Sequence, residues 1–168
     1  MKNNMRALAA LLLAASALGA CETTGGDAGE RGGVSVTRLH LGGQIARGEI
    51  RVEPADPSQT SSLDFAQLGS RVERELARLG WRVTPANARS EQVAVVRMLQ
   101  TGGGDTAVSE LNVRIQRRSD ATVAWEGRAQ LQGRAPATPA ERAALVDRLI
   151  EALFRDFPGE SGRTIRVR

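Results

Sequence analysis

The sequence is poor in the side chains that most often build reactive sites. Its 168 residues include one cysteine, one histidine and no tyrosine, and its only lysine is Lys2. A lone histidine, His40, cannot form the usual zinc clusters, which need several His or Cys ligands. A Ser-His-Asp triad would require His40 to act from a strand beside a serine that no motif marks. We therefore expect His40 to be a structural or surface residue, and no catalytic or metal site is visible.

The N-terminus has the three-part layout of an export signal. Lys2 and Arg6 form a short basic region, residues 7–18 form an apolar core, and small residues precede Cys21. The core, at about a dozen residues, is too short for a membrane-spanning helix, which needs about 20. Residues 1–20 are therefore predicted to be a signal peptide that is removed on export.

The segment Leu18-Gly19-Ala20-Cys21 resembles the lipobox of bacterial lipoproteins. This resemblance implies that Leu18, Gly19 and Ala20 are recognised by the signal peptidase. It also implies that Cys21 carries a diacylglycerol and an N-linked acyl chain such as palmitate. Each buried CH₂ contributes about 0.8 kcal/mol, so several acyl chains make membrane attachment effectively permanent. An acylated Cys21 leaves no thiol for a disulfide, a nucleophile or a metal site. The alternative is an ordinary signal peptide with a chance cysteine.

Residues 21–33 are predicted to be the lipidated cysteine and a flexible linker, because ETTGGDAGERGG has too little apolar surface to fold. By the lipoprotein sorting rule, Glu22 in place of Asp implies the outer membrane of a Gram-negative envelope, facing the periplasm. Removal of residues 1–20 lowers Lys+Arg from 23 to 21, leaves Asp+Glu at 19, and lowers the net charge from +4 to +2. This near balance argues only weakly for nucleic acid, and we expect no nucleic-acid partner. We attribute the dominance of arginine over lysine to the composition of the source genome.

Residues 34–168 are predicted to form a single domain. Strands are expected at 34–41, where β-branched residues alternate, and at 49–53. A helix is expected at 63–79, with Ser61 or Ser62 as its cap, a repeat of apolar residues at spacings of three and four, and Gly80 as its stop. A short strand at 81–83 then precedes an almost continuous apolar run at 92–100, which is typical of an interior strand.

The clearest pattern is a pair of alternating strands around a turn at 117–121. One face carries apolar residues between 111 and 131, among which Trp125 is expected to lie in the core. The opposite face carries polar residues of both charges, so we expect it to be solvated and to form cross-strand pairs.

A second helix begins at Thr138-Pro139-Ala140-Glu141, which is a capping box with proline at the first helical position. Its apolar stripe is predicted to reach Phe157 before Pro158-Gly159 stops it, and a short strand at 164–168 follows. Two one-faced helices and five to seven strands predict an α/β (α+β) two-layer sandwich. We expect one mixed, mainly antiparallel sheet with both helices on one face.

Several segments together resemble bacterial lipoproteins that carry the domain of unknown function numbered 4136. They are the lipobox, RLHLGGQIARGEIRVEP, ELARLGW, VAVVRM, VRIQRRSDATVAWEGRAQ and FPGESGRTIRV. The resemblance implies an envelope lipoprotein with an α/β domain and no established activity. It assigns a role to no residue other than Cys21, and the aromatic-rich opening common among these proteins is missing.

These observations predict a non-enzymatic envelope lipoprotein, with covalent lipid on Cys21 and no other cofactor or metal. Its partners would be the membrane, through the acyl chains, and an unidentified envelope protein, for which Trp81, Arg114 and Arg128 are the candidate surface residues. The alternative is a periplasmic hydrolase or small-ligand-binding protein with a pocket between sheet and helices. Residues 159–164 superficially resemble the end of a Walker A loop, but Arg163 replaces the lysine, so nucleotide binding is not expected.

Overall fold

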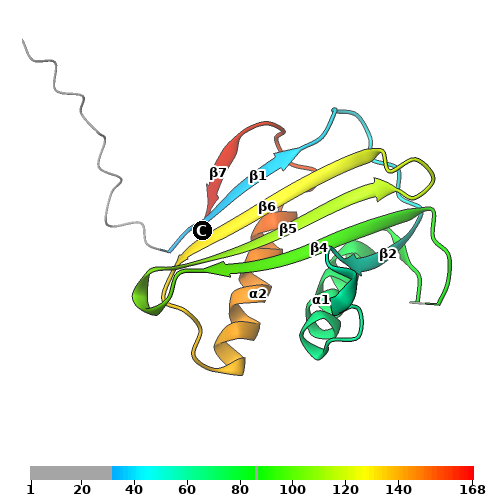
Figure 1. Cartoon of the computed structure of the whole chain (residues 1–168). Coiled ribbons are helices and arrows are strands. Elements are labelled where there is room, and N and C mark those ends of the chain that lie inside the picture. The colour runs from blue at the N-terminus through cyan, green and yellow to red at the C-terminus, as the bar shows by residue number, and fades with distance from the viewer. Residues whose placement is uncertain (1–31, 86) are drawn as a thin grey trace, which may run out of the picture.

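The protein is described by a computed structural model, in which residues 32–85 and 87–168 are described. Their core element is one open, seven-stranded mixed sheet with two helices on one face (Figure 1). The strands are β1 Val34–Leu39, β2 Glu49–Pro54, β3 Arg82–Val83, β4 Gln92–Thr101, β5 Ala107–Arg117, β6 Val123–Gly133 and β7 Thr164–Val167. The helices are α1 Leu63–Arg78 and α2 Pro139–Phe154, and short 3₁₀ turns occupy η1 Pro57–Gln59 and η2 Gly104–Thr106. The predicted two-layer α+β architecture is confirmed.

The strand order is β3-β2-β4-β5-β6-β1-β7. Only β2 forms parallel pairs, with β3 and with β4, and every other neighbouring pair is antiparallel. β4 lies between β2 and β5, as its apolar run predicts. β5 and β6 form the predicted hairpin, in which Arg114 lies opposite Glu126 and Asn112 opposite Arg128. The first strand, β1, lies between the last two strands of the chain, β6 and β7.

Both helices begin where their capping residues predict. The Ser62 hydroxyl accepts a hydrogen bond from the Phe65 N–H at 3.1 Å and so caps α1. In α2, Thr138 accepts from the Glu141 N–H, and the Glu141 carboxylate accepts from the Thr138 N–H, which completes the capping box. Each helix therefore has a fixed start and presents its apolar face to the sheet.

The core between the sheet and the helices is centred on aromatic rings. Trp125 is fully buried and stacks on Phe154, with ring centroids 5.5 Å apart. Gly127 gives this indole its space, because a Cβ there would lie 2.2 Å from the Trp125 ring. The indole N–H donates to the Pro158 carbonyl at 3.0 Å, so the buried polar atom is satisfied. The expectation that Trp125 lies in the core is confirmed.

One helix boundary differs from the prediction, because α2 ends at Phe154 and does not continue to Phe157. A further turn would use the carbonyls of Ala152 and Leu153 as acceptors for N–H groups four residues later. The Arg38 guanidinium occupies both carbonyls, and the backbone leaves the helical region at Arg155. Phe157 still joins the core, with its ring centroid 5.1 Å from that of Trp125.

Candidate functional site

The face of the sheet opposite the helices is left uncovered by them and carries charged side chains among apolar ones such as Val95, Leu99 and Val108. The register places six arginines and four glutamates on it: Arg51, Arg82, Arg97, Arg114, Arg128 and Arg166, with Glu49, Glu53, Glu110 and Glu126. Their alternation with the buried residues of the same strands follows from the period of two in a strand. We call this surface the outer face.

Three of these arginines surround one asparagine at the centre of the outer face. Arg97 of β4 and Arg128 of β6 both lie in register with Asn112 of β5, and Arg114 is two residues further along β5. The structure therefore brings together the two predicted arginines, Arg114 and Arg128, and adds Arg97, which the sequence did not single out. We call Arg97, Arg114 and Arg128 the arginine cluster.

The acidic residues of the outer face are already engaged by neighbours. The Glu110 carboxylate forms an ion pair with Arg128, whose Nε lies 3.4 Å away, and accepts a hydrogen bond from the side-chain amide of Gln130. The Glu126 carboxylate accepts from the side-chain amide of Asn112 at 3.3 Å. Within residues 32–85 and 87–168, Arg97 and Arg114 have no ion-pair partner, and both are exposed. The three arginines and the neighbouring Glu110 and Glu126 therefore carry a net charge of +1, that is three positive charges less two negative ones.

Trp81, predicted as an exposed partner-binding residue, is buried with 3% of its surface exposed, so that prediction is wrong. Its indole N–H donates to the Gln92 side chain at 2.7 Å, and its ring packs edge-on against Phe157 at 5.4 Å. Arg47 lies over the other side of the ring at 5.7 Å. Trp81 directly precedes β3, and the return of the chain to the sheet at this point places the indole in the core.

A groove of about 550 Å³ runs between α1 and α2. Ion pairs across and along the helices line it, including Arg71 with Asp147 at 2.7 Å and Arg155 with Glu151 at 3.0 Å. Arg74 also faces this groove and forms no ion pair among the described residues. Charges of both signs therefore line this groove.

A second groove, of about 490 Å³, lies at the end of the sheet where β4 begins and β5 ends. Arg118 organises this end of the sheet, since its guanidinium donates to the Glu53 carboxylate at 2.8 Å and to the Ser90 carbonyl at 3.2 Å. Neither of these two grooves is the predicted pocket between the sheet and the helices. The space there is filled by the apolar core in the described structure.

The sequence did not reveal Arg38, which is 2% exposed on the helix-facing side of β1. Its Nε donates to the Leu153 carbonyl, and its Nη2 donates to the carbonyls of Ala152 and Arg155, each at 2.9 Å. Burial lowers the pKa of Arg38 from its ordinary value, and the nearby negative charge of Asp156 opposes that shift. The signal was available, because Arg38 follows Val34 and Val36 with the period of a strand and so had to face the core.

His40 holds the loop after α2 against β1. Its Nδ1 accepts from the Gly42 N–H at 3.2 Å, so the neutral ring carries its proton on Nε2, which donates to the Gly159 carbonyl at 3.0 Å. The Ser161 hydroxyl accepts from the His40 N–H and donates to its carbonyl, both at 2.9 Å. These contacts are those of a structural histidine.

Two further findings concern the described residues. No group of three or more His, Asp or Glu side chains in residues 32–85 and 87–168 is placed to hold a metal ion. No helix in the same part of the chain is long and apolar enough to cross a membrane.

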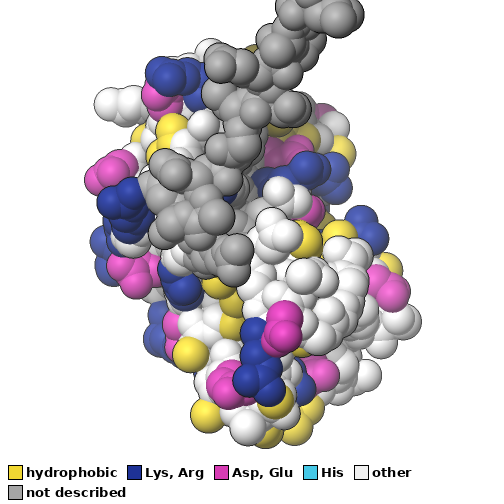
Figure 2. Space-filling model, turned by 90° about the vertical axis from the view of Figure 1, so that its left-hand side faces the viewer, with side chains coloured by type: hydrophobic (Ala, Val, Ile, Leu, Met, Phe, Trp, Pro, Cys, Tyr) yellow, Lys and Arg dark blue, Asp and Glu magenta, His cyan; other side chains and the backbone are white. Residues whose placement is uncertain are grey.

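Figure 2 looks at the end of the domain near residue 32, where basic and acidic side chains are interspersed. Leu18, Gly19, Ala20 and Cys21 lie outside the described residues.

The fold thus defines an α+β protein with one open mixed sheet. No family model matches the chain, so the resemblance to the domain of unknown function numbered 4136 stays a prediction. A relative from Zymomonas mobilis, Uncharacterized protein ZMO1243, is 21% identical over 80% of this chain and 80% of its own length.

A solved structure shows a likeness in fold. A PDZ domain protein from Parabacteroides distasonis is 12% identical, with a TM-score of 0.55, and the match covers 79% of this chain and 38% of that protein. Lipoprotein GNA1162 from Neisseria meningitidis is 14% identical, with a TM-score of 0.36, over 63% of this chain and 96% of its own.

Proposed function

We propose that this protein is a lipoprotein of a Gram-negative envelope, anchored through acyl chains on Cys21 to the periplasmic face of the outer membrane. The folded domain is a non-enzymatic binding or structural module. The observation that carries the proposal is the spacing of the basic residues, the short apolar core and Leu18-Gly19-Ala20-Cys21 at the N-terminus. Glu22 supports the outer membrane as the destination.

The organisation of the domain fits this role. β1 begins at Val34, 13 positions after Cys21, and the charged outer face is left uncovered by the helices. An unidentified envelope protein that docks on the domain remains part of the proposal, with the membrane as the second partner and no nucleic acid.

Metabolic labelling with palmitate tests the anchor. We expect the wild-type chain to incorporate the label and to sediment with outer-membrane vesicles. Cys21→Ala should lose the label and release a folded, soluble domain, and Glu22→Asp should keep the label but move to the inner membrane. Unchanged labelling and membrane retention of Cys21→Ala would overturn the anchoring proposal.

A second candidate function is the binding of a small polar ligand. The groove between α1 and α2 supports it, because its volume of about 550 Å³ falls in the range of ligand sites. A rise in the melting temperature with a zwitterionic or anionic envelope metabolite, lost in Arg74→Gln, would favour this function over a purely structural one. The periplasmic hydrolase stays a prediction.

A further inference from the structure

The outer face carries an excess of exposed positive charge at one place, the arginine cluster. We propose that this cluster is a second membrane contact, which binds the phosphate groups of anionic lipids in the same bilayer that holds Cys21. This inference rests on the proposed lipid anchor, because the anchor is what keeps the outer face close to that bilayer.

The chemistry of the cluster fits lipid phosphates. A guanidinium presents paired N–H donors in a planar fork that matches phosphate oxygens. Arg97 and Arg114 form no ion pair within 4 Å among the described residues, and the carboxylate that faces Arg114 across the strands, Glu126, accepts from Asn112. Arg128 has a side chain that is 54% exposed and forms an ion pair at 3.4 Å with Glu110, whose side chain is 18% exposed. The guanidinium groups of Arg97 and Arg114 are therefore the most available to a surface that lies over β4, β5 and β6.

The place where the chain enters the domain brings this surface within reach of the membrane. Thr37 lies three residues after Val34 and pairs with Arg128 on the neighbouring strand β6. The start of β1 is therefore about 10 Å from the cluster, measured along the strand. Two more strand spacings of about 4.8 Å lead from β6 to Arg97 on β4. Residues 22–33 can span up to about 40 Å when extended. The open face can thus turn toward the bilayer without strain on the attachment.

A weak contact is sufficient because the anchor makes it intramolecular. A tether of this length raises the effective concentration of the membrane surface at the cluster to the millimolar range. Near an anionic bilayer each arginine strengthens binding about fivefold, and the attraction decays within the Debye length of about 8 Å at physiological salt. The docked state should therefore depend on anionic lipid, on the two unpaired arginines and on ionic strength.

The test uses the acylated full chain inserted into preformed vesicles of phosphatidylcholine, with or without phosphatidylglycerol. A fluorophore is attached at Gln132→Cys, an exposed position on the outer face of β6, or at Ala144→Cys, an exposed position on α2. The introduced thiol is unique when Cys21 is acylated. Quenching by a water-soluble quencher then measures whether each face is open to solvent.

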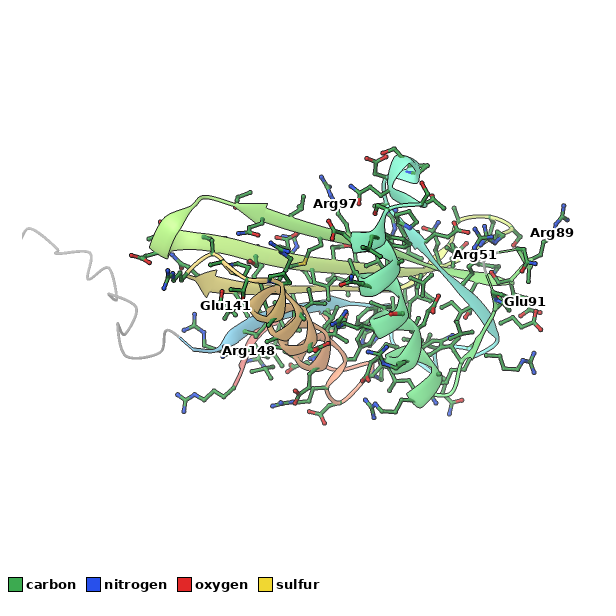
Figure 3. The ribbon with its side chains drawn as sticks, turned by 90° about the horizontal axis from the view of Figure 1, so that it is seen from below. Arg51, Arg89, Glu91, Arg97, Glu141 and Arg148 are labelled. Carbon is green, nitrogen blue, oxygen red and sulfur yellow. The ribbon has the colours of Figure 1, made fainter. Side chains whose placement is uncertain are left out.

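We expect phosphatidylglycerol to shield position 132 but not position 144, and high salt to reverse the shielding. Arg97→Gln with Arg114→Gln should lower the ratio of docked to undocked protein about 25-fold, at fivefold for each arginine. The matched control is Arg142→Gln with Arg148→Gln, which removes the same charge from exposed arginines of α2. Figure 3 shows Arg97 on β4 and Arg148 on α2, in different layers of the molecule.

The outcomes separate this inference from the proposed function. A chain that carries palmitate on Cys21 but leaves position 132 equally quenched in both vesicles would overturn the membrane contact alone. Equal loss of shielding in the two double variants would also overturn it, since net charge and not the cluster would then be responsible. A chain without palmitate would overturn the proposed anchor, and that result is read before any vesicle measurement.

Discussion

Replacement of Arg38 by methionine is the most informative perturbation of this fold. Methionine keeps much of the buried aliphatic volume but removes every hydrogen bond to the end of α2. The carbonyls of Ala152, Leu153 and Arg155 would lose the donor that now holds them at 2.9 Å. The negative charge of Asp156 would also lose the attraction of the Arg38 guanidinium.

The size of the effect follows from opposing contributions. A hydrogen bond to a charged group contributes about 1.5–3 kcal/mol, and Arg38 makes three of them. Burial of the guanidinium costs several kcal/mol, which offsets part of that gain. Methionine leaves three carbonyls without this donor, and each buried polar group left unsatisfied costs about 1–3 kcal/mol, so after the offset we expect a loss of about 3–5 kcal/mol for Arg38→Met.

Urea unfolding followed by tryptophan fluorescence measures this loss, because Trp81 and Trp125 are both buried. With a slope of about 2 kcal/mol per molar urea, the midpoint should fall by about 2 M. Arg38→Lys should give an intermediate value, since one ammonium cannot replace the fork of the guanidinium. Arg114→Met, on the exposed outer face, is the control and should change stability by less than about 0.5 kcal/mol. If Arg38→Met costs no more than Arg114→Met, the clamp on α2 does not contribute as we infer.

Two other predictions concern the loop after α2 and the start of that helix. Gly159→Ala should destabilise the protein by about 1–3 kcal/mol more than Gly162→Ala. Both positions have a positive φ, but only at position 159 would a Cβ atom lie 2.5 Å from Arg38. Equal melting temperatures of the two variants would contradict this expectation. Backbone N–H groups at the start of α2 hold the pKa of Glu141 below its ordinary value. The ionised Glu141 carboxylate therefore stabilises the fold above about pH 4.3, and this stabilisation is lost as the pH falls through the folded-state pKa. The difference in urea midpoint between wild type and Glu141→Gln should therefore shrink on acidification, and a difference that stays constant with pH would refute the role of the charge.

The local elements were predictable because their signals are short in range. Ser62 and the Thr138–Glu141 box cap their helices through residues three positions away, so four consecutive residues suffice to identify them. The hairpin of β5 and β6 follows from the alternation of apolar and polar residues around one turn. The outer face and its mixed charge follow from the same alternation.

Features set by distant contacts were not predictable in this way. Arg38 and the end of α2 are more than 100 positions apart, and the end of that helix at Phe154 depends on their contact. Trp81 is buried because Gln92 and Phe157 come to it from other parts of the chain. Arg97 joined the arginine cluster only once the register of β4 against β5 was known.

The position of β1 has a consequence for the order in which the sheet forms when the chain emerges from its N-terminal end. β1 is the first strand of the domain in the sequence, yet it pairs with β6 and β7, the last two strands. Pairings of such high sequence separation form late, because the intervening chain must first be closed into a loop. During N-to-C passage, β1 has no native neighbour until β6 emerges, and one open edge until β7 follows. Completion of the sheet therefore depends on the emergence of β7, and a chain truncated before residue 164 should leave β1 as an exposed edge prone to aggregation.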